Sequence, residues 1–267
     1  MERRGLRILK GIIFMCIIAL LALIRNNFGD VKVYLQDKEE YIRLYDDKIV
    51  LYNLRDEIID EYLLKEKIFK YFLGNISEDD RDTLVILTED RDSRYGKDIV
   101  IFSLENRIEE IYREDFSDFN PWKIAIGDID GDGVGEISIG VYKESPLHKI
   151  MAKRPFIYTF KDGVLQPKWR GSRLSRPFDD YDFIDIDDDG IDEIISIEIL
   201  EDKKKVINSY KWKGFGFEGY LESNPFKDIR DLTVKGDKIY LKVKEGNRFQ
   251  LGLLKLGKNS LEIERVN

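Results

Sequence analysis

The chain has 267 residues, of which 43% are hydrophobic and 12% aromatic, and its formal net charge is −8. This is the composition of a globular protein with enough apolar material for a core. The acidic balance argues against nucleic-acid binding, which needs a basic face, and the single cysteine, Cys16, excludes disulfides and cysteine-based metal sites within the chain.

The N-terminal segment, residues 1–27, has the layout of a signal sequence or membrane anchor. An uncharged apolar run over residues 11–24 is preceded by Arg3, Arg4, Arg7 and Lys10. No small-x-small cleavage motif accompanies the run, so we predict an uncleaved transmembrane helix, with secretion as the outcome if the segment is cleaved. The basic cluster predicts a cytoplasmic N-terminus and an extracytoplasmic domain over residues 31–267. A helix buried in a core is the alternative.

Residues 31–267 read as short strands joined by acidic or glycine-containing turns. Such turns lie near residues 46, 90, 128, 185 and 235, and Trp122, Trp169 and Trp212 recur at a similar spacing. A period of about 40–55 residues with several strands per unit is typical of a β-propeller, in which neighbouring blades bury each other's faces. The spacing therefore predicts an all-β fold with five four-stranded blades. A long β-sandwich is the alternative.

Two stretches depart from this simple pattern. Residues 56–72 form either a short helix or the outer strand of the first blade followed by the start of the second, because their periodicity fits both. Residues 90–98 have acids at the first, third and ninth positions, a pattern that returns in fuller form downstream. We hypothesise that the Arg94 guanidinium replaces a cation there and pairs with Asp90, Asp92 or Asp98. A solvated charged turn is the alternative.

Two acidic loops, residues 128–136 and 185–193, have acids at positions 1, 3, 5 and 9, glycine at position 6 and an apolar residue at position 7. Ca²⁺ takes six to eight oxygen ligands in a flexible geometry, whereas Mg²⁺ prefers to keep several waters. An acidic surface turn is the alternative. We predict two Ca²⁺ sites, one formed by Asp128, Asp130, Asp132, the Val134 carbonyl and Glu136, the other by Asp185, Asp187, Asp189, the Ile191 carbonyl and Glu193.

These loops differ from EF-hands, because position 12 is Ile139 in one and Ser196 in the other instead of a bidentate glutamate. The flanking runs are rich in β-branched residues, so each loop is predicted to join two strands. In these features the sequence resembles the FG-GAP/VCBS repeats of integrin-α-type β-propellers, whose blades have DxDxDGxx[DE] calcium hairpins. The resemblance covers the two loops and their flanking strands, and it implies a calcium hairpin and a blade rather than a particular activity.

A basic segment lies between the end of one acidic loop and the start of the other. We predict that it binds an anionic glycan, a lipid headgroup or an acidic strip of a partner, through Lys168, Trp169, Arg170, Arg173 and Arg176. The alternative is a connection between blades, with Trp169 in the core and the arginines paired to Asp179, Asp180 and Asp182.

The pattern as a whole predicts a binding or interaction module for a protein or glycan ligand, in which calcium has a structural role. No catalytic residue is predicted, because the single histidine, His148, lies in a loop context without a nucleophile elbow. Five-bladed propellers also include glycosidases, so a carbohydrate-active enzyme that uses carboxylates near the axis is the alternative.

Overall fold

A computed structural model describes residues 31–35, 39–77, 83–90, 93–171 and 173–266. The predicted anchor over residues 1–27 lies outside these ranges. Among the residues that the structure describes, no helix is long and apolar enough to cross a membrane. The regular structure of these residues consists of strands β1 to β20 and one short 3₁₀ turn, η1 (Ser117–Phe119).

The strands form five antiparallel sheets of four strands each, and each sheet is built from consecutive strands. Sheet 1 contains β1 (Val31–Tyr34), β2 (Glu40–Leu44), β3 (Lys48–Asn53) and β4 (Ile58–Leu63); sheet 2 contains β5 (Lys67–Gly74), β6 (Thr83–Glu89), β7 (Asp98–Ser103) and β8 (Glu109–Asp115). Sheet 3 contains β9 (Pro121–Gly127), β10 (Glu136–Ser145), β11 (His148–Lys161) and β12 (Val164–Trp169). Sheet 4 contains β13 (Phe178–Ile184), β14 (Glu193–Ile199), β15 (Lys205–Trp212) and β16 (Phe217–Glu222); sheet 5 contains β17 (Ile229–Lys235), β18 (Lys238–Glu245), β19 (Arg248–Leu256) and β20 (Leu261–Arg265).

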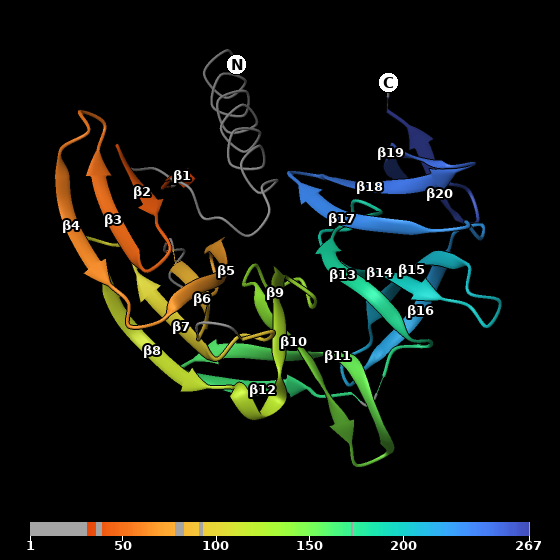
Figure 1. The fold of residues 1–267 in the computed structure, drawn as a ribbon, viewed down its shortest axis with the longest axis horizontal. Helices are drawn as coiled ribbons and strands as arrows, with labels where there is room; N and C mark the ends of the chain where they lie inside the picture. Colours follow the sequence, from red (N-terminus) through yellow and green to blue (C-terminus); the bar gives the residue numbers. More distant parts are fainter. Residues whose placement is uncertain (1–30, 36–38, 78–82, 91–92, 172, 267) are drawn as a thin grey trace.

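The first strand of each sheet lies toward the centre of the molecule and the fourth strand lies at the outside (Figure 1). The central strand β9 contacts both β5 and β13, and β13 also contacts β17. This arrangement confirms the prediction of an all-β fold with five four-stranded units. It also decides between the two structures predicted for residues 56–72. These residues contain the outer strand β4 and the start of β5, the first strand of the next sheet, rather than a helix.

The middle strands of the sheets are buried on both faces. In β6, Leu84 and Ile86 pack toward sheet 1, whereas Val85 and Leu87 pack toward sheet 3. Side chains alternate across a strand, so a continuous apolar run can supply two cores at once. Each fully buried leucine, isoleucine or valine contributes about 1.5–3 kcal/mol relative to an exposed one. Neighbouring sheets therefore stabilise each other, as expected for repeated units that cannot bury their own faces.

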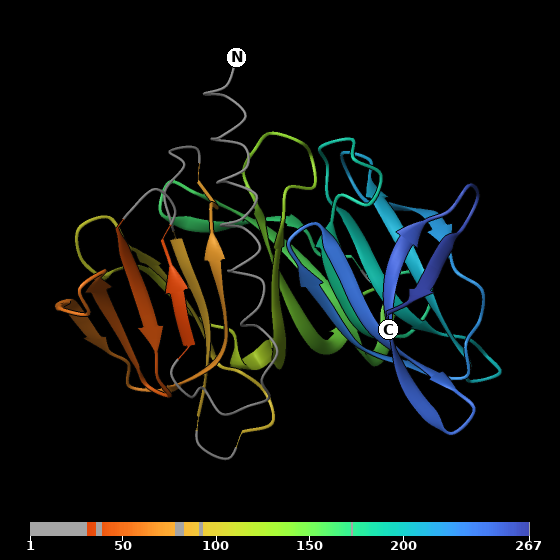
Figure 2. The ribbon, with the colours of Figure 1, turned by 90° about the horizontal axis from the view of Figure 1, so that it is seen from above.

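Four buried clusters connect the five sheets in series, one at each junction from sheet 1 to sheet 5. Among the described residues, no core cluster contains side chains from both sheet 1 and sheet 5. In Figure 1 the sheets form an arc that is open between β1 and β17, and in Figure 2 sheets 1 and 5 lie on opposite sides of this opening. The first and last sheets therefore each have one face without a neighbouring sheet.

Candidate metal sites

The two acidic loops occupy the same place in two neighbouring sheets. Loop 1 (residues 128–136) joins β9 to β10 in sheet 3, and loop 2 (residues 185–193) joins β13 to β14 in sheet 4. Both therefore connect the first strand of a sheet to the second, as the sequence predicts. The strand that follows begins at the acid of position 9, so this glutamate is fixed by the sheet rather than by the loop alone.

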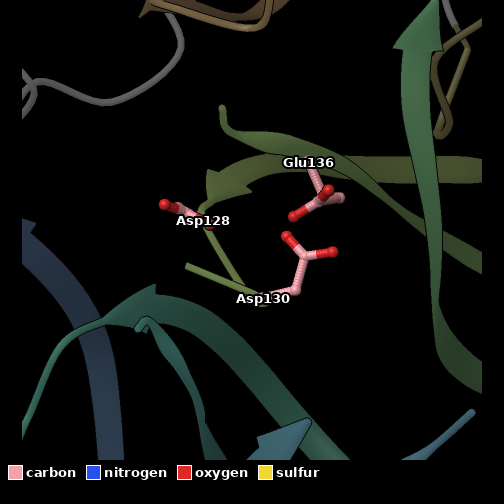
Figure 3. Close-up of side chains that lie close together, drawn as sticks. All are labelled: Asp128, Asp130 and Glu136. Carbon is pink, nitrogen blue, oxygen red and sulfur yellow. The ribbon is translucent and has the colours of Figure 1, made fainter. Parts of the chain in front are cut away.

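Each loop brings three carboxylates together. In loop 1, one oxygen from each of Asp128, Asp130 and Glu136 lies within 4.8 Å of the others, and the same holds for Asp185, Asp187 and Glu193 in loop 2. Figure 3 shows the carboxylates of Asp130 and Glu136 facing each other in loop 1. All the donor atoms are oxygens, which is the donor set of a hard cation such as Ca²⁺.

The predicted ligands at positions 5 and 7 are not part of the groups formed by the acids of positions 1, 3 and 9. Asp132 lies outside the three-carboxylate group of loop 1 and accepts a hydrogen bond of 2.9 Å from the Val134 N–H. In loop 2, Asp189 likewise accepts one of 3.0 Å from the Ile191 N–H. These two acids therefore help to shape the loops, and their part in metal binding, like that of the Val134 and Ile191 carbonyls, stays a prediction.

The first acid of each loop organises the backbone. Asp128 accepts hydrogen bonds from the N–H groups of Gly131 and Gly133, both at 2.7 Å, and Asp185 accepts one of 2.8 Å from Gly190. The glutamate at position 9 also accepts a backbone N–H, that of Ile129 in loop 1 and of Ile186 in loop 2. The two loops therefore share one hydrogen-bond pattern, in which the acids of positions 1 and 9 accept backbone N–H groups of their own loop.

A direct link connects the two loops. The Asp128 N–H donates to the Asp192 carboxylate at 2.9 Å, and the Asp192 N–H donates to the Asp128 carbonyl at 2.7 Å. Burial raises the pKa of Asp192, and the bond from Asp128 opposes this effect. An ordered loop 1 therefore constrains loop 2, and the reverse is also true.

A lysine ammonium lies at each carboxylate group. Lys168 on β12 contacts Asp130 and Glu136 in loop 1. Lys211 on β15 lies 2.8 Å from Asp187, 2.6 Å from Asp189 and 3.1 Å from Glu193 in loop 2. The carboxylates therefore already surround a cationic group, a compact single charge in each loop.

The glutamates at position 9 are the most buried acids of the two loops. The side chain of Glu193 is 0% exposed and that of Glu136 1% exposed. Burial raises the pKa of Glu136, and it raises the pKa of Glu193 to about 7. Although Lys211 Nζ is close enough to Glu193 Oε1 for an ion pair, this oxygen accepts no hydrogen bond. In loop 2 the cation that faces this buried oxygen is therefore the Lys211 ammonium at 3.1 Å, although the contact lacks hydrogen-bond geometry.

The sequence matches no protein-family model and no curated protein. Among solved structures, the chain is similar to the Dos1 propeller, with a TM-score of 0.50 and 10% identity over 89% of this chain and 70% of that chain. It is also similar to the WD40 domain of SCAP from fission yeast, with a TM-score of 0.47 and 12% identity over 88% of this chain and 53% of that chain. Five four-stranded sheets with their first strands at the centre agree with the first of these likenesses.

The fold is a β-propeller.

Within the propeller, residues 90–98 are not equivalent to loops 1 and 2. They span the connection between β6 and β7, the second and third strands of sheet 2. The hypothesis that Arg94 pairs with Asp90 or Asp98 is wrong: Lys97 lies 3.5 Å from Asp90, and Arg113 lies 2.8 Å from Asp98. Asp92 lies outside the described residues. The Arg94 guanidinium instead lies 5.7 Å from the centre of the Tyr95 ring.

The predicted ligand-binding segment covers the end of β12 and the connection that follows it in the propeller. Lys168 is engaged in loop 1, Trp169 packs at 5.1 Å against Phe217, and Arg176 contacts Glu198 and Glu222. Arg170 and Arg173 are exposed. The alternative pairing of the arginines with the following aspartates is wrong, because Asp180 and Asp182 bind Lys123 and Asp179 binds Lys205. Ligand binding by the two exposed arginines stays a prediction.

Sequence reasoning missed Lys211, although a signal for it is present. The dipeptide Lys-Trp occurs at residues 168–169 and again at residues 211–212. In the propeller, Trp169 and Trp212 both lie 5.1 Å from the Phe217 ring, and the lysine before each reaches an acidic loop. A repeated Lys-Trp pair in a chain with two repeated acidic loops is therefore a sequence signal for these two lysines, although strand register decides which acids they meet.

We expect Gly133→Ala and Gly190→Ala each to lower the free energy of unfolding by about 1–2 kcal/mol, because an alanine Cβ disfavours the left-handed region. Both glycines have φ of +85°, and a Cβ there would meet nothing within 4 Å, so the effect comes from the backbone alone. Chemical denaturation of the full-length chain measures this loss. Gly219→Ala is the matched control, because Gly219 has open space in β16. Equal stability of all three variants would contradict the backbone geometry of the loops.

Proposed function

We propose that this chain is a calcium-binding β-propeller that acts as an extracytoplasmic binding module, with one structural Ca²⁺ in each of loops 1 and 2. The observation that supports this most directly is the repeated arrangement: three carboxylates, one of them buried, on one hydrogen-bond pattern in two sheets. The resemblance of these loops to FG-GAP/VCBS hairpins also supports calcium. The propeller fold supports an interaction role, because stacked blades present extended surfaces to partners.

The residues present fit a hard cation. Asp128, Asp130 and Glu136 would hold one ion, and Asp185, Asp187 and Glu193 the other. A bound Ca²⁺ would supply two positive charges to carboxylates that otherwise repel each other. Its binding free energy would then add to the stability of the folded chain. For an affinity of about 10⁻⁴ M, calcium at a hundredfold excess over this value stabilises the fold by about 2.7 kcal/mol.

The carbohydrate-active alternative would use carboxylates near the propeller axis. Two acids of the central strand β13, Asp180 and Asp182, do converge, but they lie 2.9 and 3.0 Å from Lys123 Nζ on β9. Burial opposes the charge of Lys123, yet Asp182 and Asp180 more than offset this and raise its pKa. We therefore assign these acids to the junction of sheets 3 and 4, and the proposal does not include catalysis.

The membrane part of the proposal rests on the sequence alone. The basic and apolar residues of segment 1–27 would hold the propeller at the outer side of a membrane, or direct its secretion if the segment is removed. The ligand would be a protein or a glycan. Fractionation of cells that express the full-length chain, followed by protease treatment of intact cells, tests this placement. Protection of the propeller from protease in intact cells would contradict it.

We expect the purified full-length chain to bind two calcium ions in isothermal titration calorimetry, with dissociation constants of about 10⁻⁴ to 10⁻³ M. Asp128→Asn and Asp185→Asn should each remove one ion, because each aspartate both organises its loop and supplies an oxygen. Asp237→Asn is the control, since Asp237 lies in the exposed turn between β17 and β18 outside both groups. A chain that takes up no calcium at millimolar concentration would refute the proposal.

A further inference from the structure

A pocket of about 310 Å³ lies at the junction of sheets 2 and 3, on residues other than those of loops 1 and 2. It is lined by Arg94, Tyr95, Trp122, Tyr142 and Lys153. The first two residues belong to the connection between β6 and β7, and the other three belong to β9, β10 and β11. A hydrogen bond of 2.7 Å from the Gly96 N–H to the Pro121 carbonyl fixes the connection against sheet 3.

The walls of this pocket are aromatic and held in place by packing. The rings of Tyr95 and Tyr142 are stacked, with centroids 6.0 Å apart and planes at 11°. Trp122 packs edge-on against the buried Tyr181 at 5.9 Å, and its Nε1–H donates to the Val141 carbonyl at 3.3 Å. Because these rings are already positioned, a flat or ring-shaped ligand can pack on them with little loss of side-chain entropy.

The charged groups of the pocket are cationic, its hydroxyl groups are phenolic, and no carboxylate of the described residues lines it. The Lys153 ammonium lies 4.2 Å from the centre of the Trp122 ring and donates to the Asp179 carbonyl. Burial lowers the pKa of Lys153. Within the described part of the chain, neither Arg94 nor Lys153 has a carboxylate within ion-pair distance. In a protein with a net charge of −8, two such cations on aromatic walls indicate a site for an anion.

The same residues distinguish between ring-shaped anions. The edge of a nucleobase presents amino donors as well as acceptors, and the pocket offers few acceptors to pair with them. Hydroxyl groups of a sugar can rotate to accept hydrogen bonds from the guanidinium, the ammonium and the tyrosine hydroxyls. The volume is at the small end of the range of ligand sites, about 300–1,000 Å³, which suits a small ligand such as one or two sugar rings.

We propose that this pocket binds an acidic sugar residue, with the sugar ring packed on Trp122 and Tyr142 and its carboxylate bound by Arg94 and Lys153. The proposal specifies the ligand of the binding module proposed above. It needs neither loop 1 nor loop 2, because none of the lining residues belongs to them. Binding in the presence of a chelator therefore separates a failure of this proposal from a failure of the calcium proposal.

The test is titration of the full-length chain with sodium glucuronate, glucose, adenosine monophosphate and inorganic phosphate, each with excess calcium and with EDTA. We expect glucuronate to bind with a dissociation constant of about 1 mM, or about −4 kcal/mol, at least about tenfold more tightly than glucose. The intrinsic fluorescence should change on binding, because Trp122 lines the pocket. Tighter binding of adenosine monophosphate, equal binding of phosphate, or no binding of glucuronate at tens of millimolar would each overturn the proposal.

Variants locate the binding to this pocket. Arg94→Gln and Lys153→Gln should each weaken glucuronate binding by about tenfold, the effect expected from loss of one charge-assisted hydrogen bond. Arg107→Gln is the matched control, because Arg107 is an exposed arginine that follows strand β7 of the same sheet and contacts only Glu109 among the described acids. Since Arg94 is exposed, its replacement should leave the thermal unfolding unchanged. Unaltered glucuronate binding by both pocket variants would overturn the proposal.

Discussion

Replacement of Lys211 with methionine is expected to raise the calcium affinity of loop 2 by about 10- to 100-fold. A calcium ion and the Lys211 ammonium would compete for the carboxylates of Asp187 and Glu193, and the ammonium also contacts Asp189. Calcium must displace the ammonium, and loss of one or more charge-assisted hydrogen bonds at about 1.5–3 kcal/mol opposes its binding. Each 1.4 kcal/mol corresponds to about tenfold in affinity, so removal of the lysine should raise the calcium affinity by one to two factors of about ten.

The same variant should be less stable than the natural protein when calcium is removed. Without Lys211, the buried Glu193 and its neighbours lose their positive partner, a change that costs about 3–5 kcal/mol in buried pairs. Thermal unfolding of Lys211→Met should therefore show a lower melting temperature in EDTA and a larger increase on addition of calcium. Lys168→Met should behave in the same way through loop 1.

Lys204→Met is the control for both lysine variants, because Lys204 is exposed and pairs only with Asp202 among the described residues. The experiment also decides between two roles of the lysines. If Lys211→Met loses stability and gains no affinity for calcium, the lysines are the permanent counter-ions of the acidic loops. The calcium proposal would then fail, even though the geometry of the loops would stay as described.

Replacement of Lys123 with methionine is expected to destabilise the propeller by about 3 kcal/mol, the lower end of the range for a broken buried ion pair. The Lys123 side chain is 14% exposed and bridges Asp180 and Asp182, which are 27% and 24% exposed. Its loss leaves two neighbouring carboxylates on β13 without their cation, at the junction of sheets 3 and 4. Urea denaturation of the full-length chain measures the effect.

Two further variants test the origin of this loss. Lys123→Met combined with Asp180→Asn and Asp182→Asn should recover most of the stability, because the carboxylates that repel each other are gone. Lys97→Met should cost less than about 1 kcal/mol, since the Lys97 side chain is 31% exposed and its pairs with Asp90 and Glu66 are longer, at 3.5 and 3.9 Å. If Lys97→Met and Lys123→Met lower the free energy of unfolding by similar amounts, the contacts of Lys123 with Asp180 and Asp182 contribute no more than a surface ion pair.

The repeated fold could be predicted from the sequence because its signals are local. Alternating β-branched residues and turn residues mark single strands and hairpins, as at Asp162-Gly163 between β11 and β12, where both residues have positive φ. The two acidic loops were placed correctly between strands for the same reason. Five units of four strands follow from adding such local signals along the chain.

The equivalence of the repeats could not be predicted, because an acidic turn suits any hairpin. The turns near residues 46 and 90 join the second and third strands of their sheets, whereas loops 1 and 2 join the first and second. The tryptophans are similarly spaced in sequence, but Trp122 lies in the first strand of its sheet, Trp169 in the fourth and Trp212 in the third. The spacing of the turns and tryptophans therefore predicted the correct number of sheets, although these residues occupy different positions within their sheets.

The contacts between these two lysines and the acids could not be predicted from the sequence. Lys211 faces Glu193 across adjacent strands, whereas Lys168 reaches Glu136 from the outermost strand of its sheet, past β11. Which lysine meets which acid depends on strand register and on the bulge at the end of β12, and neither is visible as a pattern in the chain.

The opening between sheets 1 and 5 makes this propeller a linear array in its energetics. Each sheet is formed by one contiguous stretch of chain, and among the residues that the structure describes each core joins only sequential neighbours. The stability of such an array is approximately a sum of nearest-neighbour contributions, and no late closure of the ring by distant strands is required. Because each sheet is one contiguous stretch of chain, the fold favours assembly sheet by sheet as the chain is synthesised, with sheet 5 the last to gain a partner and, with sheet 1, the first to fray.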